Sequence, residues 1–322
     1  MEDVNIEHLL DVFTTINVDS NIIWDVCSHF MDHLYWHKPR LVMLGPKIEG
    51  LPDVHPSKAR CLIELSWLFE LVGNHTERKR LLIHALELCR MWGDDFGIVR
   101  ALRPLSDANR LLDLHEEGIQ QVNEALEICE RLNDVFGRAR SLHELAWLFY
   151  DDQQFDVAEN AASQLIDLLP LDQHLVCQCH RLLGEIHSSI GEIEKAVDHF
   201  KTALGIAFSF GWYYEEFWSH CGLAGLFSGQ GRFDDSHTHV EHARSHAVND
   251  TYLVGRVMHL KAVVWYRQRK LREAKSEVLC AANTFEKVGA MIDLEGCRDF
   301  LCDIEEEMEE LRTSGELDLL QC

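Results

Sequence analysis

The chain has 322 residues, of which 47% are hydrophobic, and its 30 Lys and Arg against 54 Asp and Glu give a formal net charge of −24. Such a chain is long and apolar enough to bury a sizeable core, which excludes an intrinsically disordered protein. Its negative charge repels nucleic-acid phosphate and anionic membrane surfaces, so we expect neither nucleic acid nor a membrane as a partner.

The start of the chain and its cysteines indicate a cytoplasmic protein. The first residues, "MEDVNIEHLLDVF", are acidic where a secretory signal peptide is basic, and no apolar run approaches the ~18 residues of a membrane span. The 11 cysteines are scattered without a CxxC pair, and several take the place of apolar residues at helical spacing, as in "LELCRM". We therefore expect reduced, mostly buried thiols.

Small residues recur along the chain and indicate a repeat of about forty residues. One column has steps of 38 or 40 residues, at Ser28, Ser66, Ser106, Ala146, Gly184, Ala224 and Ala262. A second column lies twelve residues later, at Ala158, Ala196, Ser236 and Ala274, with Arg40, Arg78 and Gly118 as departures. Turn sequences such as "SSIGEIEKA" separate the columns, so each repeat is predicted to be helix, turn, helix.

In chain order, the predicted elements are a capping helix over 1–20, seven helix pairs over 21–293, and an acidic capping helix with a frayed tail over 294–322. The pairs are bounded at about 21–56, 57–95, 96–135, 136–173, 174–213, 214–253 and 254–293. Prolines interrupt the first pair, and Pro104 should kink the first helix of the third. One pair cannot bury its apolar stripe alone, so stability should come from stacked neighbours.

The fifth pair carries the most specific motif, with Leu183-Gly184 followed by Ala196 and Phe200. These residues resemble the tetratricopeptide-repeat (TPR) pattern W-x2-L-G-x2-Y, A-x3-F, P over about residues 20–300. The resemblance implies an all-α fold, a right-handed α-solenoid of about seven antiparallel helix-turn-helix repeats plus capping helices. The long repeat is similar to those of kinesin light chains, maltose-type transcriptional regulators and the sensor halves of nucleotide-binding signalling ATPases, although the sequence has no GxxxxGK[ST] loop.

No motif predicts catalysis or a cofactor. The segment "DDQQFD" from Asp151 has the spacing of a terpene-cyclase carboxylate box, but the repeat frame places it in the turn between paired helices. The second box such an enzyme needs is missing, because "NDTYLVGRV" from Asn249 lacks its Ser and Glu. With 19 His and 11 Cys, a nucleophile and a base can be paired by chance, so we expect no catalytic residues.

Two histidine-containing segments carry metal-ligand types. His239, His242 and His246 share one helical face, which is predicted to be the outer surface; solvated histidines are the simpler interpretation, and metal binding or a response to pH is left open. In "HLVCQCH", from His174 to His180, helical geometry scatters the side chains over several faces. No metal site is predicted.

In TPR arrays the first helix of each pair lines the concave groove through positions 2, 5, 9 and 12 of the repeat. Position 2 holds four arginines here, and further basic and aromatic residues lie beside them. The predicted groove residues are Arg60, Trp67, Arg100, Arg103, Arg110, Arg140, His143, Trp147, Tyr150, Arg256 and Tyr266. Guanidinium and aromatic groups are typical anchors of recognition surfaces.

A structural role for these arginines is the alternative. Arg60 and Arg140 each have a Glu four residues later, an arrangement worth ~0.3–0.5 kcal/mol on a helix. Arg100, Arg103 and Arg110 instead share only Asp107, so the third repeat is expected to be an uncompensated basic patch.

The sequence therefore predicts a non-enzymatic scaffold that binds a peptide or partner segment, expected to be acidic, in its groove. The alternative is a regulatory sensor module that binds a small anionic effector for a signalling NTPase or a transcription regulator. Self-association is left open, and no cofactor is expected.

Overall fold

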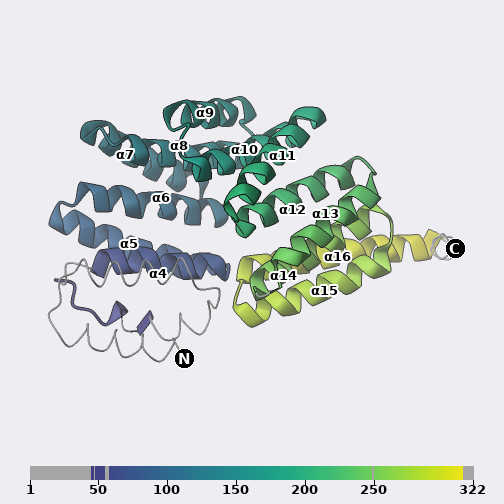
Figure 1. Ribbon diagram of the computed structural model, residues 1–322. Coiled ribbons are helices and arrows are strands. Elements are labelled where there is room, and N and C mark those ends of the chain that lie inside the picture. The colour runs from purple at the N-terminus through teal and green to yellow at the C-terminus, as the bar shows by residue number, and fades with distance from the viewer. Residues whose placement is uncertain (1–44, 47, 55–57, 249, 315–322) are drawn as a thin grey trace. The chain divides into compact units, whose positions relative to one another are not determined.

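The computed structural model describes residues 45–46, 48–54, 58–248 and 250–314. This part of the chain is all-α and contains no strand, which confirms the predicted fold class (Figure 1). Its helices are α4 (Lys58–Leu71), α5 (His75–Trp92), α6 (Asp95–Leu111), α7 (His115–Leu132), α8 (Val135–Asp151), α9 (Phe155–Leu168), α10 (Gln173–Ser189), α11 (Ile193–Phe210), α12 (Tyr213–Gly229), α13 (Phe233–His246), α14 (Thr251–Arg267), α15 (Leu271–Val288) and α16 (Met291–Ser314). The predicted N-terminal cap and most of the first helix pair lie outside the described residues.

The structure divides into two compact units, which meet in sequence between Asn133 and Asp134. Unit 1 contains the pairs α4–α5 and α6–α7; unit 2 contains α8–α9, α10–α11, α12–α13, α14–α15 and the terminal α16. In each unit the helices of a pair pack on each other, and the first helix of a pair also contacts the first helix of the next (Figure 1). This second contact places the predicted groove positions of neighbouring repeats side by side.

Side-chain caps explain where the first helices begin. Asp94, Asp134 and Asp172 precede α6, α8 and α10, and each accepts a hydrogen bond from the backbone N–H three residues later. Such caps satisfy amides that have no partner within the helix. A glycine marks the C-terminal end of α5. Gly93 adopts the left-handed conformation with φ of 66°, so its N–H donates to carbonyl groups of the last turn and the helix ends there.

Buried small residues bring the helices close together. Ala85, Ala146, Ala196 and Ala262 are fully buried, as expected for residues at helix crossings. Pro104 is buried inside α6, which runs from Asp95 to Leu111 without a break. No helix among the described residues has the length and apolar character needed to cross a bilayer.

Candidate binding surface

The predicted groove residues all lie on first helices, but in two units that we describe separately. Arg60 and Trp67 are on α4, and Arg100, Arg103 and Arg110 are on α6, all in unit 1. The remaining residues belong to unit 2, namely Arg140, His143, Trp147 and Tyr150 on α8 and Arg256 and Tyr266 on α14.

The third repeat is not the uncompensated basic patch that the sequence predicted. Arg100 Nη2 lies 3.0 Å from Glu64 Oε1 on the preceding first helix, and Arg110 Nη2 lies 2.8 Å from Asp107 Oδ1. Glu64 was expected to serve Arg60, four residues before it. The contact between α4 and α6 brings this carboxylate from the neighbouring repeat next to Arg100.

Arg78, at the start of α5, forms a buried ion-pair network that sequence reasoning missed. Its guanidinium lies 2.5 Å from Glu70 Oε2 and 2.6 Å from Asp107 Oδ2. Burial alone would raise the pKa of Asp107, but the charges of Arg110 and Arg78 hold that pKa well below its ordinary value. The one signal in the sequence was the departure of Arg78 from a small-residue column.

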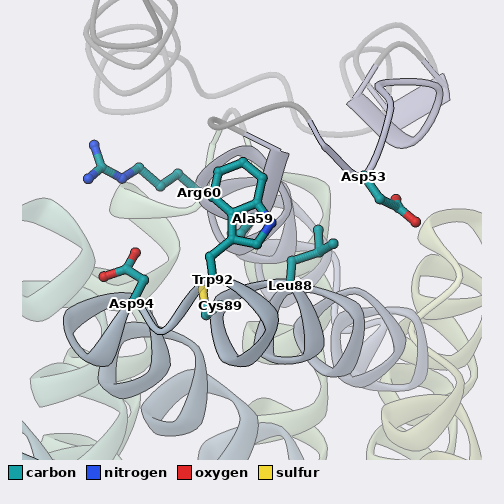
Figure 2. Close-up of a pocket in the computed structure, with 7 residues that line it drawn as sticks. All are labelled: Asp53, Ala59, Arg60, Leu88, Cys89, Trp92 and Asp94. Atoms are coloured by element: carbon teal, nitrogen blue, oxygen red, sulfur yellow. The ribbon is translucent and has the colours of Figure 1, made fainter.

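Arg60 lies at a small pocket of unit 1, together with residues of α5, Asp53 before α4 and Asp94 after α5 (Figure 2). The lining residues are Asp53, Ala59, Arg60, Leu88, Cys89, Trp92 and Asp94. Figure 2 shows the Trp92 ring between Asp94 and Arg60 on one side and Asp53 on the other. Burial raises the pKa of the Cys89 thiol to about 11, so this cysteine is neutral and a poor nucleophile.

On α8 of unit 2, three of the four predicted residues, His143, Trp147 and Tyr150, form one connected group. Trp147 Nε1 donates a hydrogen bond to His143 Nε2 at 3.2 Å, and the Trp147 ring meets the Tyr150 ring edge to face, with centroids 5.6 Å apart. Arg140 Nη2 is 3.8 Å from Asp172 Oδ2, in the cap of α10. Burial raises the pKa of Tyr150, whose hydroxyl is within hydrogen-bonding distance of Ser189.

Residues of α10 and α12 add a polar network that the sequence analysis did not select. Glu215 is buried, and it accepts a hydrogen bond from Gln178 at 3.0 Å and lies 3.4 Å from His174 Nε2. Arg181 lies 3.6 Å from Glu215 and 5.0 Å from the centroid of the Trp147 ring. Arg181 occupies position 5 of its repeat, so reading that position in every repeat would have found it.

The remaining two predicted residues make contacts within the last repeats. Arg256 Nη1 lies 2.7 Å from Asp293 Oδ1, and its guanidinium is 5.1 Å from the centroid of the Trp218 ring. Tyr266 meets Phe300 of α16 edge to face at 5.3 Å. Tyr266 is therefore tied to the terminal helix.

The segments that suggested metal chemistry have other environments. The chain from Asp151 to Phe155 forms the turn between α8 and α9, as the repeat frame indicated. Cys177 and Cys179 are buried in α10, and burial raises the pKa of each thiol to about 12. In the described part of the chain, no group of three or more His, Cys, Asp or Glu side chains is arranged to hold a metal ion.

The predicted outer histidines are joined by a fourth from the paired helix. His220 of α12 has its Nδ1 2.9 Å from that of His239, and its ring stacks on His242 at 4.9 Å and on His246 at 6.1 Å. The expectation of simply solvated histidines is therefore wrong for His239, because this side chain packs between two helices.

Comparison with known proteins identifies the fold. No family model matches the sequence, and no curated protein matches it. Solved structures do match, with a Rap protein complexed with competence and sporulation factor at a TM-score of 0.63 and 14% identity, over 85% of this chain and 82% of that one. The apo form of RapI has a TM-score of 0.59 and 14% identity, over 82% and 99%.

A signal-transduction ATPase from Pyrococcus horikoshii with a tetratricopeptide-repeat sensor has a TM-score of 0.57 and 16% identity, over 92% of this chain and 50% of the ATPase. The likeness to these structures is one of fold. This chain therefore has a TPR-like helical-repeat fold.

Proposed function

We propose that this chain is a non-enzymatic, cytoplasmic interaction module that binds a peptide or partner segment against the first-helix face of unit 2. The contacts of α8 with α10, of α10 with α12 and of α12 with α14 support this proposal, because they bring the first helices of four repeats next to one another. The Rap protein that shares the fold is complexed with competence and sporulation factor, which agrees with a binding role.

Arg140 carries the proposal, because its ion pair is the most exposed and the longest among those of Arg100, Arg110, Arg140 and Arg256. Its side chain is 41% exposed and 3.8 Å from a carboxylate, whereas Arg256 is 36% exposed and 2.7 Å from its partner. An exposed pair of this kind contributes at most ~1 kcal/mol. Arg140 can therefore exchange Asp172 for a carboxylate of a bound segment, which a guanidinium fork fits well.

Trp147 and Tyr150, which are partly buried against the core of unit 2, would supply the apolar part of the same surface through their exposed edges. The hydrogen bond from Trp147 to His143 fixes the indole before any partner arrives, so little side-chain entropy is lost on binding. Large, rigid aromatic groups next to an arginine are the usual centre of a recognition surface. An acidic segment with one apolar side chain is the partner that this combination favours.

Peptides selected from a random displayed library against the full chain would test the proposal. We expect the selected peptides to be rich in Asp or Glu and to bind Arg140→Glu at least tenfold more weakly than the wild type. The matched control is Arg138→Glu, which makes the same charge change at an exposed position on the same helix and should leave binding unchanged. Equal binding to both variants, with helicity intact, would refute the proposal.

A sensor function is the second candidate. It is favoured by the match to the ATPase with a TPR sensor, because half of the ATPase chain aligns with 92% of this chain. The partner in that case is a small anion. In that case no peptide is selected, and phosphate-bearing metabolites raise the melting temperature of the wild type. The Arg138→Glu variant keeps this rise in melting temperature, and the Arg140→Glu variant loses it.

A further inference from the structure

Two pairs of histidines occupy the same place in consecutive repeats of unit 2. The Nδ1 atoms of His180 and His199 are 2.9 Å apart, and so are those of His220 and His239. The members of each pair are 19 residues apart and join the two helices of one repeat. In the first described repeat, the residues with this spacing at the equivalent place are Leu62 and Leu81, both fully buried. In the fifth and sixth repeats, two titratable imidazole rings therefore stand where the second repeat has two leucine side chains.

The short distance between the two Nδ1 atoms limits how many protons a pair can hold. One Nδ1 must carry a hydrogen and donate it, while the other accepts. A first additional proton can enter at the Nε2 of the donor ring and leave this bond intact. A second would place two N–H groups, and two positive charges, against each other. Each pair therefore holds at least one proton fewer than two separate imidazolium rings.

The surroundings of His199 also disfavour charge. His187 of α10 stacks on it, with centroids 5.1 Å apart and planes 9° apart. Burial lowers the pKa of His199 to about 4, helped by His180, His187 and Lys195, while Asp198 opposes the shift. The carboxylates beside His187 are Glu192 at 2.9 Å and Glu159 of α9 at 3.9 Å.

The second cluster repeats this arrangement with four histidines. Burial lowers the pKa of His220 to about 3, and His239, His242 and His246 add to the shift. Burial and His242 also lower the pKa of His239, with Lys201 of α11 acting in the same direction and Asp235 opposing it. Glu216 lies 3.5 Å from His246 Nε2, at the edge of the cluster.

We propose that the two histidine clusters make the segment from α10 to α13 acid-sensitive, so that it holds together above neutral pH and loosens between pH 7 and pH 5. An unfolded histidine has a pKa near ~6.5, whereas burial lowers the pKa of the four paired histidines, His180, His199, His220 and His239. The unfolded chain therefore takes up more protons in this range. Stability is fully present above pH ~6.5 and falls as the pH drops below it.

The test is the pH dependence of urea unfolding of the full chain. Between pH 7 and pH 5, we expect each cluster to lower the folding equilibrium constant by roughly 20-fold. A fourfold variant replaces the paired histidines with leucine, as in the Leu62 and Leu81 pair. Its folding equilibrium constant should fall much less between pH 7 and pH 5 than that of the wild type. The substitutions are His180→Leu, His199→Leu, His220→Leu and His239→Leu. His115→Asn in unit 1 is the control and should keep the wild-type pH dependence.

Hydrogen exchange of the wild type gives a second readout that needs no substitution. After correction for the intrinsic effect of pH, amides of α10 to α13 should exchange faster at pH 5 than at pH 7, relative to those of α6 and α7 in unit 1. The same protection at both pH values, or a leucine variant as acid-sensitive as the wild type, would overturn the proposal. The pairwise variants His180→Leu with His199→Leu, and His220→Leu with His239→Leu, replace the fourfold variant if it does not fold.

Discussion

At the scale of single residues, Arg78 shows how a charge can stand where the repeat pattern expects a small side chain. It is buried, and carboxylates of Glu70 and Asp107 lie on either side of it. Asp107 comes from the next repeat, 29 residues later. The ion pair therefore ties two repeats of unit 1 together, in addition to their apolar contacts.

Replacing Arg78 with Ala should destabilise the protein by about 3–5 kcal/mol, because it leaves buried carboxylates without their main counter-charge. Urea unfolding at pH 7 measures this cost. The matched control is Arg90→Ala on the same helix, which breaks a half-exposed pair with Glu124 and should cost at most ~1 kcal/mol. Similar costs for the two variants would contradict the assignment of Arg78 as a buried structural charge.

The lowered pKa of Asp107 adds a pH dependence to this prediction. A carboxylate with a depressed folded pKa contributes stability that is present above its unfolded pKa of ~3.9 and is lost as the pH falls below it. The Arg78→Ala variant should show a smaller loss of stability between pH 5 and pH 3 than the wild type.

At the scale of helices, the glycine of the TPR motif has a packing role in the fifth repeat. A Cβ atom on Gly184 of α10 would lie 2.8 Å from ring carbons of Phe200, and a Cβ atom on Gly222 of α12 would also collide with this ring. Phe200 is fully buried. The ring is therefore wedged against glycines of two neighbouring first helices, which lets α10, α11 and α12 pack closely.

Gly184→Ala should destabilise the protein by about 1–2 kcal/mol. Overpacking costs about 1–3 kcal/mol, and the better helix propensity of Ala recovers up to ~1 kcal/mol. Gly205→Ala is the matched control, since Gly205 lies on α11 with nothing near its Cβ position, and it should be neutral or stabilising. Thermal unfolding followed by circular dichroism measures both, and a stabilising Gly184→Ala would rule out the wedge.

At the scale of the whole molecule, the formal charge of −24 dominates the electrostatics. Repulsion among the excess carboxylates opposes the compact state, and salt screens it. Salt also weakens exposed ion pairs, but each of these contributes at most ~1 kcal/mol.

Raising NaCl from about 10 mM to 300 mM at pH 7.5 should therefore raise the melting temperature, because the Debye length falls from ~30 Å to well under 10 Å. Repeating the experiment near the sequence pI of about 5.1 is the control, since little net charge remains there and the effect should vanish. A melting temperature that falls with salt at pH 7.5 would show that ion pairs outweigh repulsion.

The sequence by itself determined the all-α, helix-turn-helix character of this protein. That information is local: caps such as Asp134, small residues such as Ala146 and turn residues act within one repeat, and their recurrence every 38 to 40 residues is visible without coordinates. The four arginines at position 2 of the repeat were also found from the sequence, because the face of a helix on which a residue lies follows from its spacing.

Only the tertiary structure decided which charges those arginines meet and which histidines pair. Glu64 reaches Arg100 from the preceding repeat, Glu215 lies beside Arg181 from the following one, and His199 meets His180 from the second helix of the same repeat. These partners are 19 to 36 residues apart in sequence. Their distance in space depends on how helices cross, because packing and not helical spacing brings the side chains together.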